Sequence, residues 1–166
     1  ASDTKVHEAI IGLANTGNNA DNYMTVWMNF FKSADRQAGQ TDLMNSTLES
    51  CINQENWRSA ATFLAEPANQ LGRTKQVQEL LAGIEQLKKD ENTNKFFAHY
   101  WTAPALIFFS KEVNRTLNPE LFFDLVKEVN HLTEDPANLN DELDLRSISN
   151  FLKVDNRGKK RNETEQ

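Results

Sequence analysis

The helical spacing of its apolar residues constrains the fold of this chain more than any other feature. Apolar residues recur three and four positions apart along most of the sequence, which places them on one face of a helix. After Thr74, for example, Val77, Leu80, Leu81 and Ile84 share a face. The 6 glycines among 166 residues are too few for the many tight turns of an all-β protein. The pattern predicts an all-α fold of about seven or eight helices, packed as a bundle or an irregular helical globule.

Proline and asparagine divide this pattern into segments. Asn118-Pro119-Glu120 predicts a helix start, because it combines a capping side chain, a proline at the first helical position and an acid near the positive end of the helix dipole. A short helix is expected to end before Pro67, because the residue before a proline is driven out of the helical region. Helices are predicted at residues 4–14, 21–31, 41–53, 57–64, 74–89, 96–113, 118–132 and 139–154.

The densest apolar stretch, residues 96–109, holds six of the fifteen Phe, Tyr and Trp residues. A helix that is apolar on all sides is normally buried, so the helix from Phe96 to Val113 is predicted to be central. Pro104 lies inside it and has no backbone N–H, which costs about 3 kcal/mol in a helix interior unless the helix bends. We therefore expect a kink near Pro104.

Three neighbouring residues of this stretch, His99, Tyr100 and Trp101, are the candidates for binding a partner or ligand. Each has an apolar body and a polar tip, and such side chains supply much of the energy at interfaces. The alternative is that they belong to the core.

The chain is predicted to form one helical domain over residues 1–154, followed by a disordered polar tail over residues 155–166. The tail carries Arg157, Lys159, Lys160 and Arg161, which form a candidate patch for a polyanion or for localisation. A tail that only aids solubility is the alternative. No period of 20 to 50 residues is evident, and the Phe-Phe doublets are unevenly spaced, which argues against a solenoid.

Charge and composition narrow the possible partners. A net charge of −6 argues against nucleic-acid binding by the body of the protein and favours a basic protein partner. No apolar run approaches the 18 residues of a membrane span, and residues 1–10 lack a hydrophobic signal core. The single cysteine, Cys51, lies on an apolar helix face and is expected to be an inert core thiol. These features favour a cytoplasmic location, with secretion as the alternative.

Residue spacings typical of catalysis are absent from the sequence. The glycines do not assemble into a phosphate loop, and the three histidines, His7, His99 and His131, do not form an HExxH or Cys/His zinc pattern. No cofactor, no metal and no catalytic residue are therefore predicted, and the protein is expected not to be an enzyme.

The leading hypothesis is a small acidic helical adaptor, inhibitor or immunity-type protein that binds another protein, with homo-oligomerisation possible. Residues 143–154 followed by the basic run Arg-Gly-Lys-Lys-Arg are similar in character to the end of interferon-gamma-type cytokines. This resemblance covers about a fifth of the chain and implies, as the alternative, a secreted helical signalling protein. A second alternative is a protein that binds an apolar ligand or a lipid surface.

Overall fold

A computed structural model describes residues 20–93 and 101–134, and all regular structure in these ranges is helical. The elements in chain order are α2 (Ala20–Phe31), η1 (Ala34–Arg36), α3 (Thr41–Asn53), α4 (Trp57–Leu64), η2 (Pro67–Gln70), α5 (Thr74–Thr93), α6 (Thr102–Phe109), η4 (Glu112–Thr116) and α7 (Pro119–Glu134), where η marks a 3-10 helix. The described ranges confirm the all-α prediction and contain six α-helices, against seven or eight predicted for the chain. The predicted helices at 4–14 and 139–154, the domain boundary at residue 154 and the tail lie outside them.

Asparagine side chains cap the start of two helices, and the sequence predicts the one at Asn118. The side chain of Asn118 accepts a hydrogen bond from the Leu121 N–H at 3.1 Å, and Pro119 occupies the first position of α7. Asn56 likewise accepts from the Ser59 N–H at 3.3 Å and starts α4. These caps satisfy backbone donors that have no partner inside the helix.

The helix that contains Pro104 is shorter than predicted. Its described part, α6, ends at Phe109 and not at Val113, and residues 112–116 form the separate 3-10 helix η4. Pro104 is the third residue of α6, where a backbone N–H would have no partner within the helix. The proline therefore removes no hydrogen bond from within α6, and the kink predicted for the longer helix stays a prediction. Residues 96–100 of the predicted helix lie outside the described ranges.

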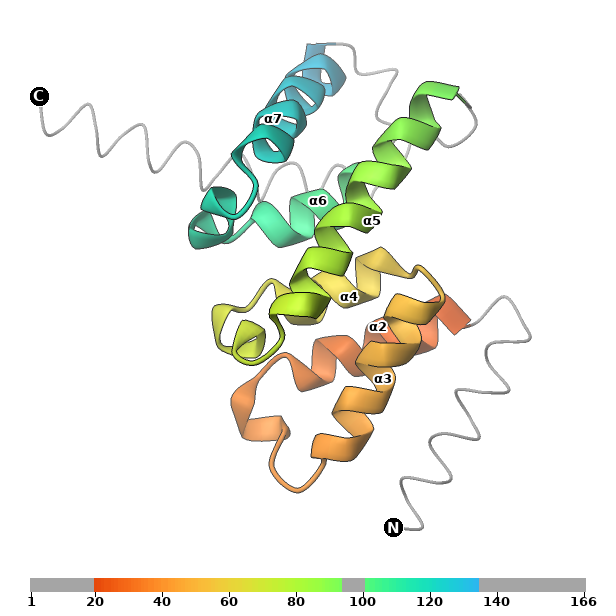
Figure 1. Cartoon of the computed structure of the whole chain (residues 1–166), viewed down its shortest axis with the longest axis vertical. Helices are drawn as coiled ribbons and strands as arrows, with labels where there is room; N and C mark the ends of the chain where they lie inside the picture. The colour runs from red at the N-terminus through yellow and green to blue at the C-terminus, as the bar shows by residue number, and fades with distance from the viewer. Residues whose placement is uncertain (1–19, 94–100, 135–166) are drawn as a thin grey trace, which may run out of the picture.

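The nine described elements are three copies of one structural unit, each a helix, a 3-10 helix and a second helix (Figure 1). The first helices end at Phe31, Leu64 and Phe109, and the second helices begin at Thr41, Thr74 and Pro119, so both boundaries recur after 33 and then 45 residues. We define unit 1 as residues 20–53, unit 2 as residues 57–93 and unit 3 as residues 102–134. The three units follow one another along the long axis of the molecule.

The turn before the second helix supports this equivalence. Gly39 in unit 1 and Gly72 in unit 2 stand 33 residues apart and have φ angles of 74° and 72°. This is the left-handed region, which glycine enters without steric cost. The corresponding residue of unit 3, Leu117, has a φ of −73° and needs no glycine.

The expectation that the chain contains no repeat was therefore wrong. The repeat is not evident in the sequence because the spacing between copies is unequal. Helix α5 is longer than α3, and residues 94–101 separate units 2 and 3. Their core positions also tolerate different side chains: Thr47, Leu80 and Leu125 are equivalent, and all are fully buried. This equivalent position is therefore buried in all three units, although the residue type differs.

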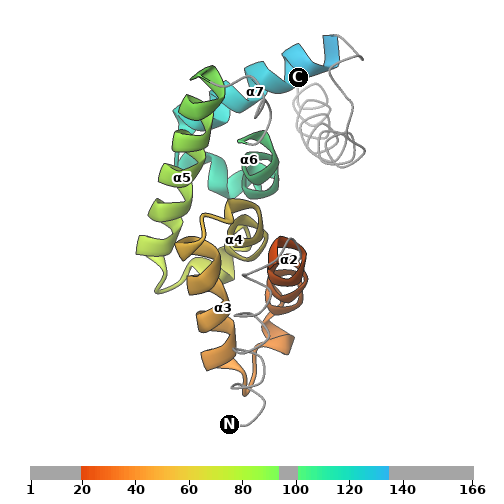
Figure 2. The same ribbon diagram turned by 90° about the vertical axis from the view of Figure 1, so that its right-hand side faces the viewer.

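The first helices stack directly on one another, α2 on α4 and α4 on α6. Figure 2 shows α3 and α5 beside this stack, while α7 crosses its upper end. Packing between α3 and α5 is sparser than packing within the stack. The core lies between the two sets of helices, and its largest fully buried side chains are Phe31, Phe63, Phe108, Phe109, Met24, Met28, Leu64, Leu80, Ile84, Leu121, Leu125 and Val129. Cys51 is fully buried, as predicted for a core thiol.

A line of amide side chains, here called the amide ladder, joins the units where the first helices end. It consists of Gln37, Asn69, Gln70 and Asn114. Gln37 of unit 1 donates to the Asn69 Oδ1 of unit 2 at 2.8 Å, and Gln70 of unit 2 donates to the Asn114 Oδ1 of unit 3 at 2.8 Å. The same glutamine-to-asparagine hydrogen bond therefore occurs where unit 1 meets unit 2 and where unit 2 meets unit 3, here called the first and second junctions.

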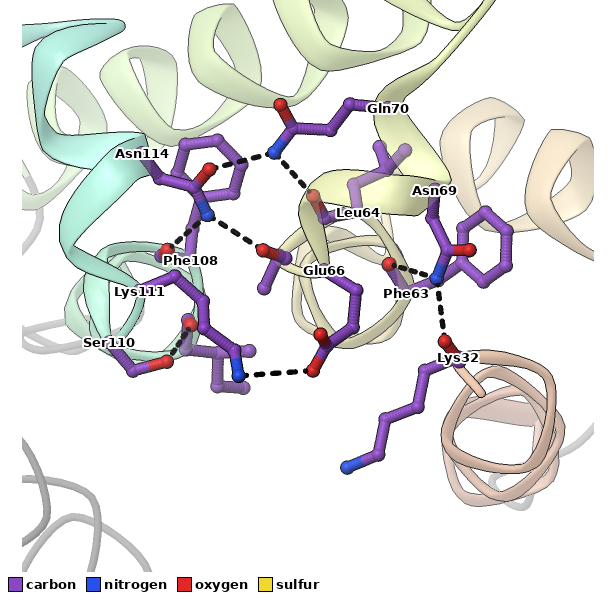
Figure 3. A network of polar contacts seen from close by, with 12 residues as sticks. Lys32, Phe63, Leu64, Glu66, Asn69, Gln70, Phe108, Ser110, Lys111 and Asn114 are labelled. Carbon is purple, nitrogen blue, oxygen red and sulfur yellow. Dashed lines mark hydrogen bonds and ion pairs between the residues drawn. The ribbon is translucent and has the colours of Figure 1, made fainter. Parts of the chain in front are cut away.

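Each asparagine of the ladder also bridges two units through its Nδ2 atom. Asn114 donates to the carbonyls of Phe108 in its own unit and Ala65 in unit 2, both at 2.8 Å (Figure 3). Asn69 donates in the same way to the carbonyl of Phe63 at 3.0 Å and to that of Lys32 in unit 1 at 2.9 Å. The last carbonyls of a helix have no intrahelical donor, so these amides satisfy them inside the core.

Candidate functional site

A groove of about 570 Å³ lies between α3 and α5, where the second helices of units 1 and 2 diverge. This volume falls in the range of small-ligand sites and of clefts that take a few side chains. The lining residues are Asn45, Leu48, Glu49, Ile52 and Asn53 from α3 and Leu71, Gly72, Arg73, Lys75, Gln76 and Glu79 from the start of α5 and the turn before it. The groove is the candidate functional site.

Helical spacing builds both walls. Asn45, Glu49 and Asn53 stand four residues apart on α3, so they form one row along the groove. Lys75 and Glu79 stand four apart on α5, and their charged groups lie 3.9 Å from each other. The walls are thus polar, while Leu48 at 2% exposure and the half-buried Ile52 supply an apolar floor.

Arg73 fixes the relation between the two walls. Its guanidinium donates to the Asn45 Oδ1 across the groove and to the Asn69 carbonyl, both at 3.0 Å. It also lies 5.1 Å above the centre of the Phe63 ring. Burial lowers the pKa of Arg73 from its usual value, yet an arginine stays protonated in proteins, so the group remains cationic. Arg73 therefore links the turn after α4 to α3 across the groove.

The remaining groups of the groove suit a segment of polypeptide. Asn53 and Gln76 carry amides that both donate and accept, as the N–H and C=O groups of a peptide backbone require. Glu49 is exposed and offers a carboxylate to a basic side chain. Leu71, on the rim, is 79% exposed and offers an apolar contact. The groove thus carries amide donors and acceptors, an exposed carboxylate and an exposed apolar side chain.

Lys88 bridges the next pair of second helices, α5 and α7. Its ammonium group contacts the carboxylates of Asp124 on α7 and Glu85 on α5, the latter at 3.5 Å. Burial, the largest single effect, acts to lower the pKa of Lys88, but the hydrogen bond to Asp124 and the charges of Glu85 and Asp124 together raise it. The groove lies between α3 and α5, and the equivalent place between α5 and α7 is therefore crossed by the ion pair of Lys88 with Asp124.

Of the three aromatic-segment candidates, the structure describes Trp101. Its side chain is 3% exposed and lies next to α6 in the core, with the Lys88 ammonium 6.0 Å from its ring centre. Trp101 is therefore a core residue of the array and offers no open surface to a partner. His99 and Tyr100 lie outside the described ranges, as do Arg157, Lys159, Lys160 and Arg161 of the predicted basic patch.

Residues 20–93 and 101–134 contain neither a cluster of metal-binding side chains nor a membrane-spanning helix. No three His, Cys, Asp or Glu side chains in these ranges are placed to hold a metal ion. None of the described helices has the length and apolar character needed to cross a bilayer.

Sequence reasoning missed both the ladder and the groove. The available signal for the ladder was an asparagine five residues after the apolar end of a first helix, followed by Gln or Arg, as in Asn69-Gln70 and Asn114-Arg115. The groove has no such signal, because it depends on how far α3 and α5 diverge. Comparison of the chain with family models, with curated proteins and with solved structures gives no match.

Proposed function

We propose that the protein is a non-enzymatic interaction module that binds another protein through the groove between α3 and α5. Three stacked helical units support this proposal, because arrays of this kind present extended surfaces on which partners bind. The observation that carries it is the groove itself, whose walls combine amides with charged groups above an apolar floor.

The partner contributes an extended segment with an apolar side chain beside a basic one. The apolar side chain packs on Ile52 and Leu71, and the basic group pairs with Glu49. The backbone of the segment hydrogen-bonds to Asn53 and Gln76. The net charge of −6 favours approach of such a partner at low salt.

Site-specific photo-crosslinking tests this function. A photoreactive amino acid replaces Gln76 in the groove, and in the control it replaces Glu120, an exposed residue of α7 outside the groove. We expect a cross-linked protein in the native cell extract from position 76 and none of the same mass from position 120. Equal products from both positions would contradict a role for the groove.

A charge reversal then measures the contribution of the groove to affinity for the captured partner. Glu49→Lys is expected to weaken binding at least tenfold, because it places two like charges at the contact. Glu120→Lys changes the net charge of the protein by the same amount and serves as the matched control. Its binding should differ from that of the unmodified protein by less than about twofold, as expected for a residue outside the interface.

A further inference from the structure

Arg73 holds a positive charge in the groove, and no ion pair within residues 20–93 and 101–134 includes it. Its two hydrogen bonds, each 3.0 Å long, go to uncharged amide oxygens, the side-chain oxygen of Asn45 and the carbonyl of Asn69. A guanidinium has five N–H donors, and these bonds use two of them. The groove therefore contains a fixed cation that can still donate to an anion.

The cation between the second helices at the second junction is paired differently. There the carboxylate of Asp124 on α7 contacts the ammonium group of Lys88 on α5. Glu79 holds the corresponding place on α5, because both acids stand five positions after the first residue of their helix. The carboxylate of Glu79 pairs instead with Lys75 of its own helix, at 3.9 Å. A carboxylate for Arg73 is thus left for a partner to supply.

A negative group follows Arg73 along the same wall of the groove. Glu49 is exposed and stands one helical turn after Asn45 on α3, so their Cβ atoms are about 5 to 6 Å apart. The guanidinium of Arg73 is hydrogen-bonded to the Asn45 side chain, so its charge lies about one turn from that of Glu49. The α3 wall therefore presents a positive and then a negative group to whatever lies in the groove.

An extended polypeptide has a repeat of similar length. It advances about 3.3 Å per residue, and its side chains point alternately to opposite sides. Side chains two positions apart therefore share a side and lie about 6.6 Å from each other. Two such side chains of opposite charge can reach Arg73 and Glu49 together, whereas side chains one or three positions apart lie on opposite sides.

We infer that the groove selects partner segments in which an acidic and a basic residue are separated by one residue. This inference rests on the proposed function and specifies the kind of sequence that the groove binds. The acidic side chain accepts hydrogen bonds from Arg73, and the basic one pairs with Glu49. A segment without the acid covers Arg73, removes water from its charge and provides no anion in return, so the groove discriminates against it.

Selection of peptides from a random display library tests the inference on the unmodified protein. Peptides that bind the protein but not its Glu49→Lys variant occupy the groove and are sequenced. We expect them to carry an acidic and a basic residue with one residue between them far more often than the unselected library does. Peptides that depend on Glu49 but lack this pattern would overturn the inference and leave the proposed function standing. A library that yields no Glu49-dependent peptide would contradict both.

A double-mutant cycle between protein and peptide tests the contact of Arg73. Replacing the acidic residue of a selected peptide by its amide is expected to weaken binding about tenfold. Arg73→Gln, which can still donate to the Asn69 carbonyl, is expected to weaken binding by a similar factor. The two changes together should cost no more than about twofold beyond the larger single change, because each removes the same contact.

The matched control is Arg36→Gln, which removes the same charge outside the groove and should leave peptide affinity within about twofold of the unmodified protein. Additive effects in the cycle would mean that Arg73 acts only through the shape of the groove, and they would overturn the inference. The peptide selection needs no variant of Arg73, so it decides the question if Arg73→Gln does not fold.

Discussion

The two junctions of the array share one polar connection and differ in their charges. Both place a glutamine on the asparagine of the next unit at 2.8 Å. Among the described residues, ion pairs join units 2 and 3, between Glu66 and Lys111 at 3.3 Å and between Lys88 and Asp124, and none joins units 1 and 2. The second helices pack sparsely at the junction without ion pairs, and the groove lies there. Amide hydrogen bonds thus occur at both junctions, whereas the second helices are joined by the Arg73–Asn45 hydrogen bond at the first junction and by the Lys88–Asp124 ion pair at the second.

Of the changes at the two junctions, replacing either ladder asparagine by aspartate should lower the free energy of unfolding most. A carboxylate cannot donate, so Asn69→Asp or Asn114→Asp removes two hydrogen bonds and buries a charge at a position that is 3% or 1% exposed. We expect each variant to lose about 3 kcal/mol of unfolding free energy at pH 7, measured by urea denaturation. The control is Asn53→Asp, an exposed residue expected to change stability by less than about 0.5 kcal/mol.

Agreement between the two variants is the decisive outcome. If the ladder steps are equivalent, the losses for Asn69→Asp and Asn114→Asp should agree within about 1 kcal/mol, the usual context dependence of a buried hydrogen bond. A large loss at one junction only would show that the two steps carry different energies despite their equal geometry.

Truncating the glutamines should have a smaller effect. Gln37→Ala and Gln70→Ala each remove two donated hydrogen bonds, but both side chains are half-buried, so water can replace part of what is lost. We expect losses of about 1 to 1.5 kcal/mol from each, again by urea denaturation. Combining Gln70→Ala with Asn114→Ala should cost less than the sum of the single changes, because the two residues contact each other. If the two stability losses simply add, the hydrogen bond between Gln70 and Asn114 does not couple the two residues energetically.

Lys88→Met should affect only the second junction. It keeps an apolar stem of similar length and removes the ion pairs to Asp124 and Glu85, which are partly exposed and therefore screened by solvent. We expect a loss of about 0.5 to 1 kcal/mol at low salt, most of it absent at 1 M salt. A variant whose stability loss is independent of salt would instead indicate a packing role for the side chain.

The pH dependence of Lys88 has a defined sign. Its pKa is raised in the folded protein, so the ion pairs stabilise fully below the ordinary value of 10.5 and lose their contribution as the pH rises through the higher folded value. The stability difference between the unmodified protein and Lys88→Met should therefore shrink only above about pH 10. Denaturation curves at pH 8 and in this alkaline range make the comparison.

Glu66→Gln should have the smallest effect. Glu66 and Lys111 are 34% and 45% exposed, and pairs of this kind contribute little. We expect a loss below about 0.5 kcal/mol in urea denaturation. A loss above 1 kcal/mol would mean that the pair, and not the ladder alone, holds unit 3 on unit 2.

Local signals in the sequence predicted the helices well, and relations between helices poorly. The helix start at Asn118-Pro119 and the helix end before Pro67 follow from backbone chemistry within a few residues, so they were predictable. The repeat was not, because Thr47, Leu80 and Leu125 satisfy the same buried position with different side chains. Trp101 shows the limit for site prediction: one aromatic residue suits a core or an interface equally, and only its 3% exposure decides between them.

The residue before the ladder glutamine differs between units 1 and 2. Unit 1 has Arg36 at the asparagine position, and its guanidinium packs 5.0 Å from the Phe30 ring and has no acceptor to offer. Unit 1 therefore lacks the acceptor that Asn69 and Asn114 supply in units 2 and 3. Unit 2 alone carries both a receiving asparagine and a donating glutamine. It is the module that protein engineers could duplicate to lengthen the array, since its two ends are complementary to each other.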